Sequence, residues 1–186
     1  PDFKCISPKQ VTMMIATKNN GFGHGIYILI PRIKQPIELF VVFRALGIIP
    51  DKEICKYILL NLECPENHSL LNCLNASITD ANKYMTQAEA IHHITTYAIY
   101  TPMNVDKETG IRKKREFTVD VLDNDLFPHC KTLSQKLYLL GYMALKLIKT
   151  SVGLIPTSDR DSYTNKRIDL TGTLITALFL YAFMKD

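Results

Sequence analysis

The chain has 186 residues, of which 47% are hydrophobic and 22% are charged. This size and balance suit one compact domain, or one domain with part of another. The net charge of +4 permits contact with a polyanion without requiring it, since many soluble domains are mildly basic. No signal peptide is visible, and the longest apolar run, residues 174–184, is too short to span a bilayer. We therefore expect a buried helix there and no membrane partner.

The cysteines predict an intracellular chain. Cys5, Cys55, Cys64, Cys73 and Cys130 form no Cys-x-x-Cys pair, and an odd number cannot all pair within one chain. Reduced thiols are the simpler interpretation. Because the chain starts without Met and stops within a helical pattern, we also expect it to be a fragment.

The first third predicts a β-hairpin and a helix. Residues 11–16 and 26–30 are apolar and β-branched, and the Gly-rich residues 19–25 between them tolerate positive φ. A phosphate-binding loop is the alternative for these glycines, but such loops feed a helix, and here a strand follows. Residues 37–46 could be a strand or a helix; we favour a helix that ends at Gly47.

Further helices are predicted from Pro50 and from Thr86, where Thr86 and Glu89 form a capping box. The polar, basic residues 109–115 are interpreted as a break and as the most plausible internal boundary. Beyond it the pattern is helical almost throughout.

One C-terminal helix is expected over residues 115–125. A second should begin at Thr132, boxed with Gln135, and run to about residue 150. A last helix is expected from about residue 170 to 184. The fold class is thus α+β: a mixed N-terminal part with a hairpin or small sheet plus helices, then a mostly helical C-terminal part.

Several side-chain groups invite a metal site, and each has a plainer alternative. His92 and His93 are adjacent, so on a helix they point about 100° apart and rarely bind one ion together; one should be half-buried and the other solvated. His129 beside Cys130 is interpreted in the same way. The acids Asp120, Asp123 and Asp125 could hold a hard cation, but a solvated turn is favoured.

Two charged segments are candidates for nucleic-acid contact. The first contains Lys107, Arg112, Lys113, Lys114 and Arg115, which could neutralise phosphates or could simply be an exposed loop. No aromatic residues are interleaved with it, so the sequence does not indicate a stacking platform for single strands.

The second segment spans residues 159–169. Arg160, Lys166 and Arg167 could reach phosphate while three acids hold them in place, namely Asp159, Asp161 and Asp169. The alternative, slightly favoured, is a buried ion network that fixes one backbone geometry, because burying dense mixed charge requires every group to find a partner.

The order Asp-Arg-Asp, three spacers, Asn-Lys-Arg, then Asp-Leu and Gly172 resembles the second-largest subunit of multisubunit DNA-directed RNA polymerases. There such a segment opens the region called the fork. Residues 30–37, with Pro-Arg-Ile-Lys-Gln, and 41–54, with Phe-Arg-Ala-Leu-Gly, are similar to the lobe of the eukaryotic, RNA polymerase II-like subunit. Residues 126–129 and 140–143 resemble the stretch between the two.

The resemblance implies three parts: residues 1–110 as most of the lobe, 111–156 as a protrusion-like helical segment, and 157–186 as the start of the fork. The fragment would form part of a wall of the DNA-binding cleft and would be inactive alone, with no catalytic residue, metal or cofactor of its own. The parent complex would be a nucleotidyltransferase with magnesium held by its largest subunit. Expected partners are the other subunits, above all the largest, with template DNA and RNA.

The source and two other functions stay open. The spacers Ser162-Tyr163-Thr164 fit a large DNA virus at least as well as a nuclear enzyme, so the expected place is the nucleus, a cytoplasmic viral factory or the virion. The alternatives are a non-polymerase interaction or scaffold domain, and a small intracellular metalloenzyme that uses His92, His93 and the cysteines.

Overall fold

The computed structural model describes residues 9–100 and 106–184. Contacts divide the chain into two units, Pro1–Ile155 and Pro156–Asp186. Cys5 lies outside the described residues, and the other four cysteines are free thiols.

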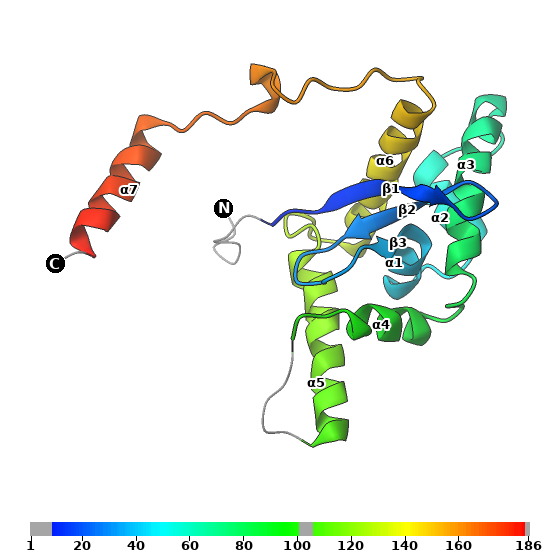
Figure 1. The fold of residues 1–186 in the computed structure, drawn as a ribbon, viewed down its shortest axis with the longest axis horizontal. Helices are drawn as coiled ribbons and strands as arrows, with labels where there is room; N and C mark the ends of the chain where they lie inside the picture. The colour runs from blue at the N-terminus through cyan, green and yellow to red at the C-terminus, as the bar shows by residue number, and fades with distance from the viewer. Residues whose placement is uncertain (1–8, 101–105, 185–186) are drawn as a thin grey trace. The chain divides into compact units, whose positions relative to one another are not determined.

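The first unit contains a small antiparallel sheet. Strands β1 (Thr12–Asn19) and β2 (His24–Leu29) form the predicted hairpin, and β3 (Ile37–Glu38) pairs with β2, which gives the order β1-β2-β3 (Figure 1). At the tip, Gly21 and Gly23 have φ of 96° and 128° and both donate their N–H to the Asn19 side chain. The glycine-rich segment is therefore a hairpin tip, where positive φ favours glycine.

Helix α1 (Leu39–Ala45) follows β3 directly and is buried along its whole length. The expected helix therefore begins two residues later than residue 37, because Ile37 and Glu38 pair with β2. Gly47 has φ of 101° and closes the helix as predicted. A helix that is apolar all round must be covered on every side, and α1 is the centre of the core.

Three helices follow: α2 (Asp51–Leu59), α3 (Pro65–Ala81) and α4 (Gln87–Thr96). The Thr86–Glu89 capping box is present at α4, as predicted. The hairpin is bonded to α3: the Ile26 N–H donates to Ser77 Oγ at 2.9 Å, and Tyr27 Oη donates to Asp80 Oδ2 at 3.1 Å. Burial and the Asp80 carboxylate raise the pKa of Tyr27 to about 12, so this phenol keeps the proton that it donates.

Helix α5 (Lys107–Asp120) continues into a π-helical turn, Val121–Asp125. The predicted break at residues 109–115 is therefore wrong, since α5 runs straight through it. Gly110 costs a helix interior about 1 kcal/mol relative to alanine, but packing of α5 against α4 outweighs that cost. The helix expected over residues 115–125 accordingly begins at Lys107.

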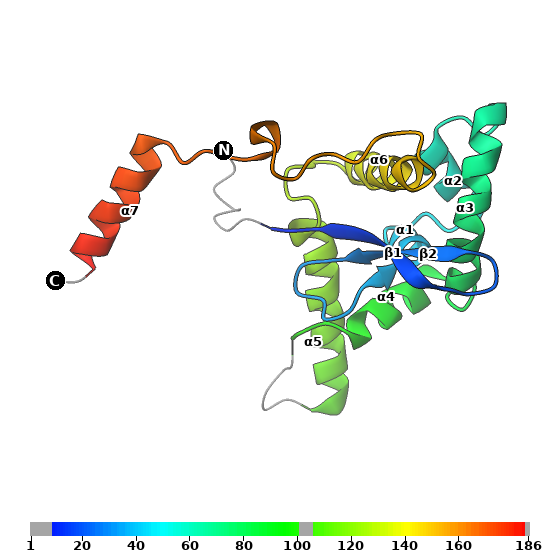
Figure 2. The ribbon, with the colours of Figure 1, turned by 45° about the horizontal axis from the view of Figure 1, so that its top comes forward.

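Helix α6 (Leu133–Ser151) carries the predicted capping box of Thr132 and Gln135. It packs mainly against α2 and also contacts β1 and α3. Figure 2 shows α6 and α4 on opposite sides of the three strands. The core between them is built from apolar side chains that are almost fully buried, including Ile28, Ile37, Phe40, Phe43, Ile54, Ile58, Leu74, Ile94 and Leu140.

The second unit holds a short 3-10 turn (Tyr163–Asn165) and helix α7 (Thr171–Phe183), which confirms the predicted last helix. The expectation that this helix is buried is wrong, because every residue of α7 is exposed. In the described part of this unit, the only other regular element is the 3-10 turn. That turn has too little apolar surface to cover α7. Among the helices in residues 9–100 and 106–184, none is long and apolar enough to cross a membrane.

Candidate nucleic-acid interface

Arg44, in the Phe-Arg-Ala-Leu-Gly block, is a structural residue. Its side chain is 1% exposed, and Nη1 donates to the carbonyl oxygens of Ala81 at 2.6 Å and Tyr84 at 2.7 Å. Nη2 pairs with Asp51 Oδ1 at 2.6 Å. A cation at the last carbonyls of a helix is favoured by the helix dipole. Arg44 therefore joins α1 to the end of α3 and the start of α2.

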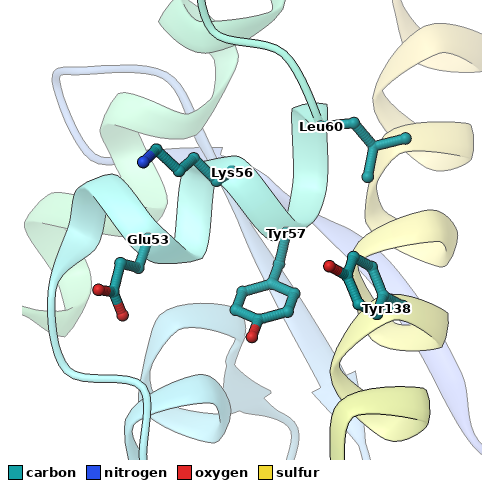
Figure 3. A pocket seen from close by; sticks show the side chains of 5 residues that line it. All are labelled: Glu53, Lys56, Tyr57, Leu60 and Tyr138. Carbon is teal, nitrogen blue, oxygen red and sulfur yellow. The ribbon is translucent and has the colours of Figure 1, made fainter.

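Helices α2 and α6 cross closely at Gly141. A Cβ atom at this position would lie 2.2 Å from the Tyr57 carbonyl oxygen. Beside the crossing, Tyr57 and Tyr138 line an open hollow of about 440 Å³. Their rings meet edge-on with centroids 5.0 Å apart. Figure 3 shows these two rings facing each other, while Glu53 and Lys56 point away from them. The hollow therefore marks a packing contact between two helices and gathers no acid–base pair.

Asp125 is the centre of a buried ion cluster. The interpretation of Asp120, Asp123 and Asp125 as a solvated turn is correct for the first two, which are exposed, and wrong for Asp125. Its carboxylate lies 3.2 Å from Lys9 Nζ and 3.2 Å from Arg32 Nε. A buried carboxylate requires such partners, and these come from positions more than ninety residues away in the sequence.

Lys136 holds the same turn from the other side. Its ammonium group is buried and donates to the carbonyl oxygens of Leu122, at 2.9 Å, and Asp123. Burial lowers the pKa of Lys136, since desolvation disfavours the charged form. This lysine therefore binds free carbonyls at the end of the π-helical turn and is not available to a ligand.

The four basic residues 112–115 all lie on α5, but they differ in how exposed they are to solvent. Arg112, Lys113 and Arg115 are exposed, whereas Lys114 is half-buried and donates to the Thr96 carbonyl oxygen at 3.2 Å. Arg112 also lies 3.8 Å from Glu116 one turn later. Arg112 and Arg115 line an open hollow of about 490 Å³, together with Glu116, Val119, Asp120 and Asp123. This outer side of α5 presents cations to solvent, interleaved with acids.

Every charged residue in the segment 159–169 is exposed to solvent. The favoured prediction of a buried network is therefore wrong for this chain by itself. Lys166 Nζ lies 3.4 Å from Asp161 Oδ1, and Asp159 Oδ1 accepts from the Asp161 N–H at 2.9 Å. Within the described residues, Arg160, Arg167 and Asp169 make no ion pair. The second unit buries almost nothing, so its charges keep their water.

The histidines lie as expected: His92 is exposed and His93 is half-buried. His93 Nε2 lies 3.2 Å from Glu38 Oε2, and its ring packs between those of Tyr84 and Tyr97. Over residues 9–100 and 106–184, no three His, Cys, Asp or Glu side chains are grouped to hold a metal. Burial raises the pKa of Cys55 to about 11, so its thiol stays protonated.

Comparison with known proteins gives the same family as the sequence motifs. Residues 7–169 match the family described as RNA polymerase Rpb2, domain 2. The chain belongs to this family. It is 29% identical over 98% of its length to DNA-directed RNA polymerase II subunit RPB2 of Schizosaccharomyces pombe, and 32% identical over 94% to RNA polymerase II subunit 2 of Arabidopsis thaliana. An archaeal relative, subunit Rpo2 of Saccharolobus solfataricus, is 27% identical over 94% of the chain.

The chain spans about 14% of the length of these relatives. The match covers the whole described part of the first unit and ends at residue 169, just before α7. Because the chain belongs to this family, we set aside the two alternative functions, a non-polymerase scaffold domain and a small metalloenzyme.

Sequence patterns missed the role of three residues of this chain. Lys9, Arg32 and Asp125 have no local pattern in common, and only the fold brings them together. The Arg32 residue lies inside the Pro-Arg-Ile-Lys-Gln motif, so its block was singled out, but nothing in the block indicates Asp125 as its partner.

Proposed function

We propose that the chain is part of the second-largest subunit of a DNA-directed RNA polymerase and lines one wall of its nucleic-acid cleft. The family match over residues 7–169 carries this proposal, supported by relatives whose names describe such subunits. In this proposal the chain contributes shape and charge and makes no covalent step. The magnesium of the complete enzyme belongs with its largest subunit.

Helix α7 supports a function within a larger assembly. Its exposed side chains include Leu174, Ile175, Leu178, Phe179 and Phe183, and each is more than half exposed. A helix that is apolar on all sides is stable in water only when other protein covers it. The relatives are about seven times as long as the segment that they share with this chain, so they have ample further sequence to provide that cover.

The cations that meet nucleic acid in this proposal come from both units. On α5 they are Arg112, Lys113 and Arg115, with Lys114 held back by its bond to Thr96. In the second unit they are Arg160, Lys166 and Arg167, which are all exposed to solvent, with Lys166 also paired to Asp161. Such contacts release counterions and are independent of sequence, which suits a wall that must accept any template.

The division into polymerase regions belongs to the same proposal. The lobe corresponds to residues 1–110, the protrusion-like segment to 111–156 and the start of the fork to 157–186, although α5 crosses the first boundary as one helix. The partners are the remaining subunits, above all the largest, with DNA template and RNA. The location is intracellular, in the nucleus or, for a viral subunit, in a cytoplasmic factory or virion.

Purification of the intact parent subunit tests this function. The subunit would be tagged in the cell that carries it, and the purified material assayed for RNA synthesis from template DNA, nucleoside triphosphates and magnesium. We expect the largest polymerase subunit to co-purify and the complex to be active, whereas the 186-residue chain alone forms no RNA. A parent subunit that purifies without other polymerase subunits and without activity would contradict the proposal.

A further inference from the structure

Two aromatic rings that are far from each other in the sequence are stacked on the surface of the first unit. Tyr100 follows α4 and Phe117 lies on α5, with ring centroids 5.0 Å apart and an interplanar angle of 20°. Tyr100 is 37% exposed and Phe117 is half-buried. A nearly parallel pair with one exposed member offers a flat π surface to solvent, which is the geometry that a nucleobase needs for stacking.

Arg32 is held over this pair. Its guanidinium carbon lies 5.9 Å from the centre of the Phe117 ring, and its Nε lies 3.2 Å from Asp125. The Arg32 backbone has φ of 62°, a strained conformation for a residue with a side chain. The Ile99 N–H donates to the Arg32 carbonyl oxygen at 3.1 Å and keeps it there. About half of the side chain remains exposed, so the cation is both positioned and accessible.

Further cations border the stacked rings. Ile33 is buried and bridges to Ala98, and the Lys34 N–H donates to the Tyr97 carbonyl oxygen at 2.9 Å, so the exposed Lys34 is tied to the end of α4, shortly before Tyr100. On α5, Lys113 lies one turn before Phe117 on the same face and is exposed. Lys114 adds a fourth positive charge close to them.

Asp125, Asp120 and Glu116 are acids close to Phe117 in the fold or in the sequence, and each already has a partner. Asp125 is buried and already shared between Arg32 and Lys9. Asp120 lies three residues after Phe117 and accepts a hydrogen bond from Asn124 at 2.6 Å. Arg32, Lys34 and Lys113 are exposed cations near the rings, and this charge favours an anionic partner.

We propose that Tyr100, Phe117 and Arg32 form a stacking platform for an unpaired base of single-stranded nucleic acid, with Lys34 and Lys113 on the adjacent phosphates. This proposal rests on the function proposed above, and it adds that the surface binds single-stranded nucleic acid. In a duplex each base face is covered by its neighbours, so a protein ring stacks readily only on an unpaired base. An acidic peptide would use the cations without the rings.

Fluorescence of 2-aminopurine tests the platform, because this base is quenched when it stacks on an aromatic ring. The 186-residue chain would be titrated into an oligothymidylate with one central 2-aminopurine and into a duplex of the same length. We expect quenching and tighter binding for the single strand. The Tyr100→Leu variant keeps an apolar side chain against Phe117 but lacks a ring, so it should lose the quenching and weaken single-strand binding roughly 5- to 100-fold.

Two controls separate the platform from general charge. Tyr138→Leu removes an exposed tyrosine from α6 and should change neither quenching nor affinity. Arg112→Ala with Arg115→Ala should weaken single-strand and duplex binding alike and leave the quenching at saturation unchanged. Thermal unfolding of every variant would show that each is folded.

The outcomes distinguish the two proposals. If Tyr100→Leu binds and quenches like the unchanged chain, or if an oligoglutamate of equal charge competes as well as the oligonucleotide, the platform is refuted while a charged wall can stand. If the arginine changes leave both affinities unaltered but Tyr100→Leu abolishes quenching, the platform stands and the proposed contact of Arg112 and Arg115 with nucleic acid is refuted. Absence of binding by the unchanged chain to both ligands would refute both.

Discussion

At the scale of single residues, the structure shows that a charged residue in a recognisable motif can serve the fold and bind no ligand. Arg44 stands in the Phe-Arg-Ala-Leu-Gly motif, and its hydrogen bonds and its ion pair all go to other groups of the fold. The same holds for Lys136 and for Asp125, whose partners are main-chain carbonyls and other side chains of the fold. The cations that we propose for contact with nucleic acid are exposed ones on α5, in the segment 32–34 and in the second unit.

Replacement of Arg44 should be the most destabilising single change among the charged residues considered. Arg44→Met keeps much of the volume but removes the side-chain donor of the Tyr84 carbonyl oxygen and one of the two donors of the buried Ala81 carbonyl oxygen, which keeps only the Tyr84 N–H. The free energy of unfolding should fall by about 2–4 kcal/mol. Denaturation in urea, followed by circular dichroism, measures the loss.

Asp51→Asn is the matched control for that change. The Asp51 side chain is about a third exposed, so water can replace part of its pairing with Arg44. The cost should stay near 1 kcal/mol or below. Equal losses for the two variants would show that the ion pair, and not the bonds to the end of α3, gives Arg44 its role.

At the scale of helices and strands, the sequence predicted the elements that depend on neighbouring residues. It did not predict those that depend on packing between distant segments. The boxes Thr86–Glu89 and Thr132–Gln135 need only residues three apart, and both helices begin where these boxes placed them. Helix α3 was missed because it is rich in Asn, Ser and Thr, which are weak helix formers, and is stabilised by the hairpin that packs on it. The first half of α5 was missed because Gly110 and the run of cations at residues 112–115 indicate a polar break, whereas the packing of α5 against α4 that stabilises the helix is not visible in the sequence.

The crossing of α2 and α6 gives a prediction at this scale. In Gly141→Ala the new methyl group meets the Tyr57 main chain, which cannot move aside as a flexible side chain would. The two helices must separate, so we expect about 1–3 kcal/mol of destabilisation, measured by thermal and urea unfolding. Gly172→Ala is the control, since a Cβ there meets nothing within 4 Å. A neutral Gly141→Ala would mean that the two helices do not approach so closely.

At the scale of the whole molecule, the fold class and the family could be predicted from the sequence. Which residues from separate segments meet on the surface could not. Short motifs such as Phe-Arg-Ala-Leu-Gly are contiguous, so a single chain displays them. The Tyr100–Phe117 pair and its Arg32 come from three separate segments, and a search for aromatics interleaved with the α5 cations could not reveal them. The ionic segment failed as a buried network because burial depends on how much protein surrounds it, which charge order alone does not show.

The central claim is that the first unit faces nucleic acid inside a transcribing polymerase, and cross-linking tests it most directly. A photo-reactive amino acid would be placed at position 112 on α5, or at position 56 on α2 as the control, in the parent subunit of an active complex engaged on DNA. The account predicts cross-links to DNA or RNA from position 112 and none from position 56. Cross-links to nucleic acid from position 56 alone, or to protein alone from position 112, would contradict it.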